Sequence, residues 1–204
     1  MSAARPQAER GSLIGSKQSA TSGLLQRGRR ATTAIAGHRV WRLPADVDTD
    51  ALAPVKWIKY SPEVIAQHCL ETLRPQFAFE ARAGDVIVAG ANFGIGSSRE
   101  QAASVLVHLG LAAVIAPSFG GMFFRNAFNV GLLLLTCRDA DALADGECIE
   151  FDAQAGVIRG VVDAQGRALG EHGPRLACDP VPAFLLELVR CGGLLPQLKR
   201  RLQR

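Results

Sequence analysis

The sequence predicts an α/β domain with crossover connections, and three successive segments carry this prediction. Residues 85–89 form an apolar run rich in β-branched residues, which is typical of a buried strand. A helical pattern follows over 98–109, and a second apolar run at 112–116 is typical of a buried parallel strand. A strand, a helix and a strand in this order form a crossover unit. The loop between the first strand and the helix is rich in glycine.

Upstream of this unit the chain predicts a strand, an acidic loop and a helix. A short strand is expected over 39–43, because a proline follows it. The acidic segment 46–50 is predicted to be a loop, and 54–60 a loop or a short strand. A helix is expected over 62–70, because Pro62 suits the first helical position.

Downstream of the unit the chain predicts a short helix and further strands. The helix is expected over 122–128, before a glycine, and a buried strand over 132–136. Segments 148–151 and 157–162 alternate in polarity, which is typical of an antiparallel pair. A last helix over 181–190 is expected to bury three residues: Phe184, Leu185 and Leu188. The basic end, 199–204, is expected to fray.

Residues 1–36 differ from the rest of the chain in composition. They are rich in Arg, Ser, Ala and Gly, contain one acid, Glu9, and show no sustained periodicity. Such a segment buries too little apolar surface to offset the entropy of ordering, so we predict a disordered basic tail over 1–36 and one folded domain over 37–204. A plain tail fits best, with a transit peptide or an over-extended start site as alternatives. We expect a cytoplasmic protein, with organellar targeting by the tail left open.

The net charge of the whole chain is +4, and residues 1–36 alone are more positive than the whole chain. The remaining residues are slightly acidic, so the basic character of the chain does not indicate nucleic-acid binding by the folded part. The alternation of aromatic and basic residues that is typical of RNA-recognition modules is absent. No apolar run resembles a membrane span. We therefore expect neither nucleic acid nor a membrane as a partner.

The glycine-rich loop has the chemistry of a site for an anionic small molecule. Gly94 and Gly96 permit positive φ angles and the close approach of a ligand. Ser97 or Ser98 is expected to cap the next helix, whose first N–H groups attract an anion. Arg99 adds a planar, permanently charged group that suits a carboxylate or a phosphate.

Two well-known phosphate-binding loops do not fit this stretch. A dinucleotide fingerprint has its third glycine, needed for close helix–sheet packing, at the position of Arg99. The phosphate loop of nucleoside triphosphatases has a lysine after its last glycine, whereas Gly96 is followed by two serines. An ordinary tight turn is the remaining alternative, and the specific run 92–100 disfavours it.

Three motifs of the chain occur together, in one order, in a single enzyme family. The motifs are 46–54 (Asp-Val-Asp-Thr-Asp-Ala-Leu-Ala-Pro), 92–100 (Asn-Phe-Gly-Ile-Gly-Ser-Ser-Arg-Glu) and 114–119 (Val-Ile-Ala-Pro-Ser-Phe). With them the chain resembles the small, swivel-domain subunit of the isopropylmalate isomerase and aconitase family of hydro-lyases, over about residues 38–200. Gln101 departs from the histidine of many members, which bears on the subfamily. The resemblance implies a layered β/β/α swivel domain with a mixed, barrel-like sheet.

The resemblance implies dehydration and rehydration of a 2-hydroxy di- or tricarboxylate, with leucine biosynthesis as the commonest role. It makes Ser97 the base that removes the proton α to a carboxylate, and Gly96, Ser98 and Arg99 substrate-binding residues. A serine can do this only where its alkoxide is stabilised, which the helix N-terminus and the arginine would achieve. A different class of function is a non-catalytic swivel module that binds a carboxylate or regulates a partner. The intact serine–serine–arginine triplet disfavours it.

Related enzymes use a 4Fe–4S cluster, whose iron acts as a Lewis acid on the substrate. The chain has five cysteines, an odd number without a C-x-x-C pair: Cys69, Cys137, Cys148, Cys178 and Cys191. This pattern indicates free thiols in a reducing compartment. We therefore expect no metal on this chain and the cluster on a large partner subunit, in a heterodimer or a heterotetramer. The chain alone would be inactive.

The acidic loop allows several interpretations. Its three carboxylates suggest calcium, but the glycine and the distal glutamate of an EF-hand loop are absent. Asp48 suits either a turn with Asx-type hydrogen bonds or the site, whereas the resemblance implies that Asp50 binds substrate.

The resemblance assigns substrate selection to the segment 57–60, which reads Trp-Ile-Lys-Tyr. Tyr60 matches the members that accept an apolar γ-substituent such as isopropyl. Lys59 stands where other members have an arginine for an extra carboxylate. Both are candidate substrate-binding residues. Isopropylmalate is favoured as the commonest substrate of the family, and homoaconitate-type, aconitate-type or methylated malate substrates are the alternatives.

Overall fold

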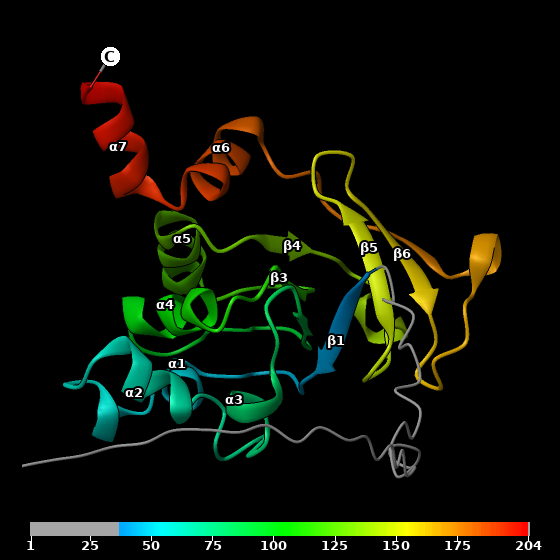
Figure 1. Cartoon of the computed structure of the whole chain (residues 1–204), viewed down its shortest axis with the longest axis horizontal. Coiled ribbons are helices and arrows are strands. Elements are labelled where there is room, and N and C mark those ends of the chain that lie inside the picture. The colour runs from blue at the N-terminus through cyan, green and yellow to red at the C-terminus, as the bar shows by residue number, and fades with distance from the viewer. Residues whose placement is uncertain (1–36, 204) are drawn as a thin grey trace, which may run out of the picture. The chain divides into compact units, whose positions relative to one another are not determined.

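A seven-stranded mixed sheet organises residues 37–203, which are the residues that the computed structural model describes (Figure 1). The strand order is β4-β3-β2-β1-β5-β6-β7. Four strands run parallel: β1 (His38–Arg42), β2 (Val86–Val88), β3 (Ala113–Ala116) and β4 (Leu134–Thr136). Three more extend the sheet by antiparallel pairing: β5 (Cys148–Asp152), β6 (Val157–Val162) and β7 (Arg175–Ala177). The predicted mixed α/β fold is confirmed. The tail predicted over 1–36 lies outside the described residues.

The predicted crossover unit is present. Helix α4 (Glu100–His108) connects β2 to β3, and every residue of these two parallel strands is fully buried. The helix begins two residues later than predicted, with Arg99 at the N-cap and no side-chain cap. The prediction that Ser97 or Ser98 caps it is therefore wrong. The physical reason is a tight turn, in which the N–H of Arg99 donates to the carbonyl of Ser97 at 2.8 Å and keeps both serines in the loop.

Short helices connect the remaining strands. Before β2 they are α1 (Thr49–Leu52), η1 (Val55–Trp57), α2 (Pro62–Gln67) and α3 (Phe77–Glu80). After β3 they are α5 (Gly121–Val130), η2 (Ala140–Ala142), η3 (Gly170–His172), α6 (Ala183–Cys191) and α7 (Leu194–Leu202). Within residues 37–203, none of the helices has the length and apolar character needed to cross a membrane.

The C-terminal helices differ from the sequence-based prediction. Phe184 is 67% exposed, and Leu186 occupies the buried position of α6 instead. Leu185 and Leu188 pack at the margin of the core, as predicted. Residues 199–202 of the basic end do not fray but form the last part of α7, which packs against α5 and α6. An amphipathic helix gains its stability from such packing, which no local signal in a basic segment indicates.

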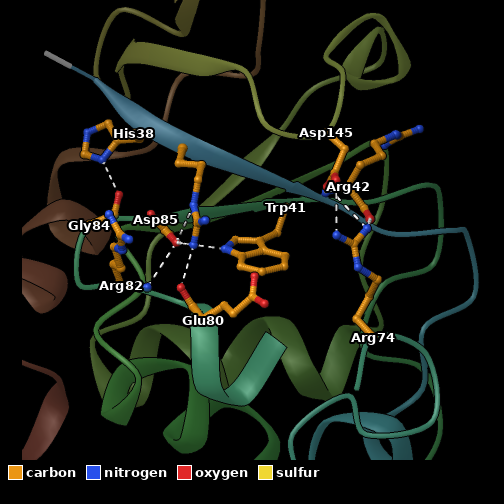
Figure 2. A network of polar contacts seen from close by, with 10 residues as sticks. His38, Trp41, Arg42, Arg74, Glu80, Arg82, Gly84, Asp85 and Asp145 are labelled. Atoms are coloured by element: carbon orange, nitrogen blue, oxygen red, sulfur yellow. Dashed lines mark hydrogen bonds and ion pairs between the residues drawn. The ribbon is translucent and has the colours of Figure 1, made fainter. Parts of the chain in front are cut away.

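A buried carboxylate fixes the amino-terminal side of the parallel strands. Asp85 directly precedes β2, and its Oδ2 accepts hydrogen bonds from the side chain of Arg39 at 2.7 and 3.1 Å. The same oxygen accepts from the Trp41 indole at 2.8 Å and from the Arg82 N–H at 3.0 Å (Figure 2). Because a buried charge is tolerated only when it is paired and hydrogen-bonded, these donors hold β1 and β2 in one register, in which Val40 lies opposite Val86.

Candidate active site

Three loops meet at the carboxyl ends of β1, β2 and β3. Parallel strands place the loops that follow them at one edge of the sheet, where open α/β folds bind ligands. The glycine-rich loop lies between the other two. On one side the N–H of Gly94 donates to the carbonyl of Val47 at 2.7 Å. On the other side the N–H of Phe93 donates to the carbonyl of Ser118 at 3.1 Å. The three motifs of the sequence therefore form one backbone-bonded surface.

Asn92 ties the same three loops together through its side chain. It adopts a left-handed conformation with φ of 61°. Its amide donates to Asp46 at 2.9 Å, and its backbone N–H donates to the Ser118 hydroxyl at 2.9 Å. Asn92 is not among the residues that the sequence predicts for the site, although it begins the central motif. An asparagine before a glycine-rich turn is the signal that could have identified this left-handed position.

Gly94 and Gly96 adopt positive φ angles of 76° and 101°. A Cβ at Gly94 would lie 2.2 Å from Cγ of Phe123, on helix α5. The loop thus rests directly on the Phe123 ring, and only glycine fits between them. At Gly96 a Cβ would lie 3.3 Å from the hydroxyl of Thr49, so the preference for glycine at this position comes mainly from its positive φ angle.

Arg99 and Asp50 form an ion pair beside the exposed serines. The Arg99 Nη1 donates to Oδ1 of Asp50 at 2.5 Å and to the carbonyl of Ala53 at 3.1 Å. The N–H of Val55 donates to the same carboxylate oxygen at 3.0 Å. The hydrogen bond from Arg99, followed by that from Val55, lowers the pKa of Asp50 below its ordinary value. The arginine side chain is only 18% exposed, so its orientation is fixed.

The structure brings most of the predicted site residues together. Gly96, Ser97 and Ser98 are exposed on the loop that ends at Arg99, which contacts Asp50. Two others, Lys59 and Tyr60, are exposed in the turn after η1, and Lys59 takes part in none of the ion pairs of residues 37–203.

The neighbouring Trp57 does not face the glycine-rich loop. Its ring stacks on the imidazole of His68, with centroids 3.9 Å apart, and the ammonium of Lys56 lies 5.4 Å from its centroid. Glu71 pairs with both His68 and Lys56, at 2.7 Å each. His68 is thus only partly exposed, and its ring holds Trp57 in place.

A cavity of about 410 Å³ adjoins the acidic loop, but its charge does not suit a polycarboxylate. Asp46, Asp48, Asp50 and Glu71 line it, and the one cation among its lining residues, Lys56, is already paired with Glu71. A dianion placed there would face like charges at short range. The glycine-rich loop is therefore the better candidate for the anion site.

The acidic loop uses its carboxylates for structure. Asp48 is the N-cap of α1, and its side chain accepts from the N–H of Ala51 at 2.7 Å, which confirms the Asx-type interpretation. Asp46 accepts from Asn92, and Asp50 from Arg99. Among residues 37–203, no group of three or more His, Cys, Asp or Glu is arranged to hold a metal ion. This part of the chain does not fit an iron–sulfur cluster.

Comparisons with known proteins identify the family. Residues 65–140 match the aconitase C-terminal domain. The chain is 43% identical over 158 residues to the 3-isopropylmalate dehydratase small subunit 1 of Archaeoglobus fulgidus, and the alignment covers 77% of this chain and 92% of the relative. The chain belongs to the family of 3-isopropylmalate dehydratase small subunits.

Other members of the family agree. The small subunit of Halothermothrix orenii is 39% identical over 163 residues, which cover 79% of this chain and 93% of the relative. The crystal structure of 3-isopropylmalate dehydratase from Methanocaldococcus jannaschii matches with a TM-score of 0.70 and 36% identity, over 80% of this chain and 93% of that chain. The predictions of the family, of the swivel-domain fold and of a hydro-lyase subunit are confirmed.

We expect Gly94→Ala to destabilise the small subunit by about 2 kcal/mol or more, because it adds both an overlap with Phe123 and a strained backbone angle. Urea unfolding at neutral pH measures this change. Gly146→Ala is the control for strain alone, since Gly146 has a φ of 81° but no atom near its Cβ position. Gly121→Ala, with neither feature, should stay within about 0.5 kcal/mol of wild type. Equal losses at Gly94 and Gly146 would contradict the close packing.

The titration of Asp50 should depend on Arg99. Because the folded-state pKa is lowered, the ion pair contributes stability above about pH 3.8, the ordinary pKa, and this contribution is lost as the pH falls through the folded pKa. The contribution is small, no more than about 1 kcal/mol, because Asp50 is largely exposed. Carboxyl ¹³C NMR measures the pKa directly. In Arg99→Gln the midpoint of Asp50 should rise toward 3.8, whereas that of Asp163, which is lowered by Arg167, should not move.

Proposed function

We propose that this chain is the small subunit of an enzyme that interconverts 2- and 3-isopropylmalate by dehydration and rehydration. The observation that carries the proposal is the arrangement of Ser97 and Ser98 in an exposed loop whose last residue, Arg99, is held by Asp50. The names of the relatives, which are 3-isopropylmalate dehydratase small subunits, support the choice of substrate. Cytoplasmic localisation is part of the same proposal.

Ser97 acts in this proposal as the base that removes the proton α to a carboxylate. A serine hydroxyl is far too weak an acid to serve unless its alkoxide is stabilised. Helix α4 begins three residues later and has no side-chain cap, so the N–H groups of its first turn are available to an anion. The permanent charge of Arg99 adds to the positive end of the helix dipole. Together these groups favour the alkoxide.

Arg99 binds a carboxylate of the substrate in this proposal, with Ser98 and the backbone of Gly96. Within residues 37–203, both hydrogen bonds of the Arg99 side chain use Nη1, so the edge formed by Nε and Nη2 is available to a carboxylate. Asp50 was expected to bind substrate directly. We propose instead that it acts by orienting the guanidinium, because its own negative charge would repel a malate carboxylate.

The remaining groups of the active site come, in this proposal, from a large subunit that also carries the 4Fe–4S cluster. The five thiols of this chain are free, and four of them are buried. The loop that carries the serines is exposed, as a surface that completes its site against a partner must be. The cluster, the partner and the assembly as a heterodimer or heterotetramer are the parts of this proposal that rest on the family resemblance.

Lys59 favours an alternative substrate class, a tricarboxylate of the homoaconitate or aconitate type. The side chain is exposed in the turn after η1, where a partner or a substrate can reach it. A lysine buried beside an isopropyl group without a counter-ion would be costly, whereas a third carboxylate would pair with it. Tyr60, which is 57% exposed, offers apolar contact area in the same turn. A small methylated malate is a further alternative.

Ser97→Ala, assayed with the co-expressed large subunit, should lower kcat by ~10²–10³-fold with little change in KM, because the lost group acts in proton transfer. Arg99→Lys should also raise KM, since a point charge replaces a planar fork. Steady-state turnover of isopropylmalate measures both. The control is Ser104→Ala, whose hydroxyl contacts only the backbone of α4. A near-normal kcat in Ser97→Ala would leave the chain as a non-catalytic carboxylate-binding module.

Lys59→Val should distinguish the two substrate classes. If Lys59 binds a third carboxylate, kcat/KM for a tricarboxylate should fall by about 2 kcal/mol or more, that is about 30-fold, while isopropylmalate is spared. The comparison of kcat/KM for both substrates, in wild type and variant, measures the difference. Lys56→Val is a matched control, because Lys56 is engaged by Glu71. Equal effects on both substrates would show that Lys59 does not select the substrate.

A further inference from the structure

The two edge strands of the sheet approach each other at their ends. The sheet begins at β4 and ends at β7, which have no strand neighbour on their outer sides within residues 37–203. Two residues beyond β7, the N–H of Asp179 donates to the carbonyl of Thr136, the last residue of β4, at 2.8 Å. This hydrogen bond joins the two edges of the sheet, β4 and β7, at one point.

Two cysteines lie side by side at this point. Cys137 directly follows β4, and Cys178 directly follows β7. The thiol of Cys137 donates at 3.5 Å to the carbonyl of Ala177, the residue before Cys178, and the two thiols lie close enough to shift each other's pKa. Both are free thiols. The remaining cysteines lie elsewhere in the fold, in the segment after α2, in β5 and at the end of α6: Cys69, Cys148 and Cys191.

One member of the pair is accessible to small solutes. Cys178 is partly exposed and lines a cavity of about 390 Å³, together with Arg138, Asp139 and Asp179, whereas Cys137 is buried behind it. The cavity is open to water and has charged walls, which suits a small polar oxidant. The contact between the two thiols lowers the pKa of Cys137 and raises the pKa of Cys178, so Cys137 is the thiol that ionises more readily.

We propose that Cys137 and Cys178 are a site of oxidative modification, at which a peroxide converts the two thiols into a disulfide that joins the edges of the sheet. The sulfur of Cys178 attacks one oxygen of the O–O bond and becomes a sulfenic acid, and the displaced hydroxide leaves with the proton of Cys178 as water. The sulfur of Cys137 then attacks the sulfenic sulfur, and its proton leaves with the second hydroxide as water. In sum, two thiols and one hydrogen peroxide give one disulfide and two waters.

The disulfide would join the two edges of the sheet covalently, and this effect does not depend on the proposed activity. The link closes a loop that contains β5, β6 and β7, and a disulfide across a loop of this length restricts the unfolded chain strongly. It also joins the C-terminal part of the sheet to β4, the neighbour of the strand that leads to Ser118. The oxidised small subunit should therefore be more resistant to unfolding than the reduced one.

The test is to treat the purified full chain with hydrogen peroxide and to map its peptides without reduction. We expect a linked pair of peptides containing Cys137 and Cys178, lighter by about two hydrogen masses and separated by dithiothreitol. The melting temperature should rise by about 5–10 °C on oxidation and return on reduction. Cys178→Ser and Cys137→Ser should abolish the linked peptides and the rise in melting temperature.

Cys191→Ser is the matched control, because a hydroxyl can keep the polar contacts of Cys191 with Glu187 and Arg200. It should form the link as the wild type does. Mapping of the wild type requires no variant to fold, so the proposal stays testable even if a substitution of the buried Cys137 is destabilising. Oxidation of Cys178 to sulfinic or sulfonic acid without a link, a link that involves another cysteine, or no reaction with peroxide would each overturn the proposal.

Discussion

The close contact between Gly94 and the Phe123 ring is the constraint on which the site depends. Without a side chain, the glycine-rich loop lies directly on helix α5, which comes from the next crossover connection of the sheet. Because the loop lies so close to α5, its backbone can form hydrogen bonds with the loops on both sides, from Gly94 to Val47 and from Phe93 to Ser118. A loop raised by one methyl group would lose these bonds, and the exposed serines would lose the rigid support that positions them.

The second constraint is the buried carboxylate of Asp85, which lies at the amino-terminal ends of the parallel strands, opposite the site. Asp85 accepts from two side chains of β1, Arg39 and Trp41, so β1 cannot slide along β2 without leaving a buried carboxylate unsatisfied. Trp41 is enclosed further by the Phe77 ring, at 5.1 Å between centroids, and by the Arg39 guanidinium, at 4.5 Å from the centroid of the indole ring. A fixed register at this end of the strands determines which residues of the first two loops meet at the other end.

The arrangement of charges around Arg99 is consistent with the proposed removal of a proton by Ser97. Asp50 neutralises part of the charge of Arg99 and fixes its direction, and the hydrogen bonds from Arg99 and then from the N–H of Val55 lower the pKa of that carboxylate. Ser97 and Ser98 remain exposed before the uncapped start of α4. A preorganised group of this kind needs little reorganisation when charge develops in the reaction. The negatively charged cavity beside Asp48 and Glu71 adjoins this group through Asp50, which lines it.

The sequence by itself determined the order of the main elements and the location of the site. Burial of a strand on both faces demands a run such as 112–116, and a positive φ at Gly94 demands glycine, so both features are visible in the local sequence. The three motifs were sufficient for the family. The start of α4 was predicted less accurately. A serine before a helix is a potential N-cap, but the tight turn at Ser97 prevents it from capping this helix.

Only the tertiary structure decided which distant residues meet. The pairing of Arg99 with Asp50, the support of Gly94 by Phe123 and the contact of Cys137 with Cys178 each join segments far apart in the chain. Local periodicity also failed at the C-terminus, where α7 is helical because it packs on α5 and α6. The physical reason is the same in each case: a sequence pattern records whether a side chain prefers burial or exposure, whereas its partner is fixed by the path of the whole chain.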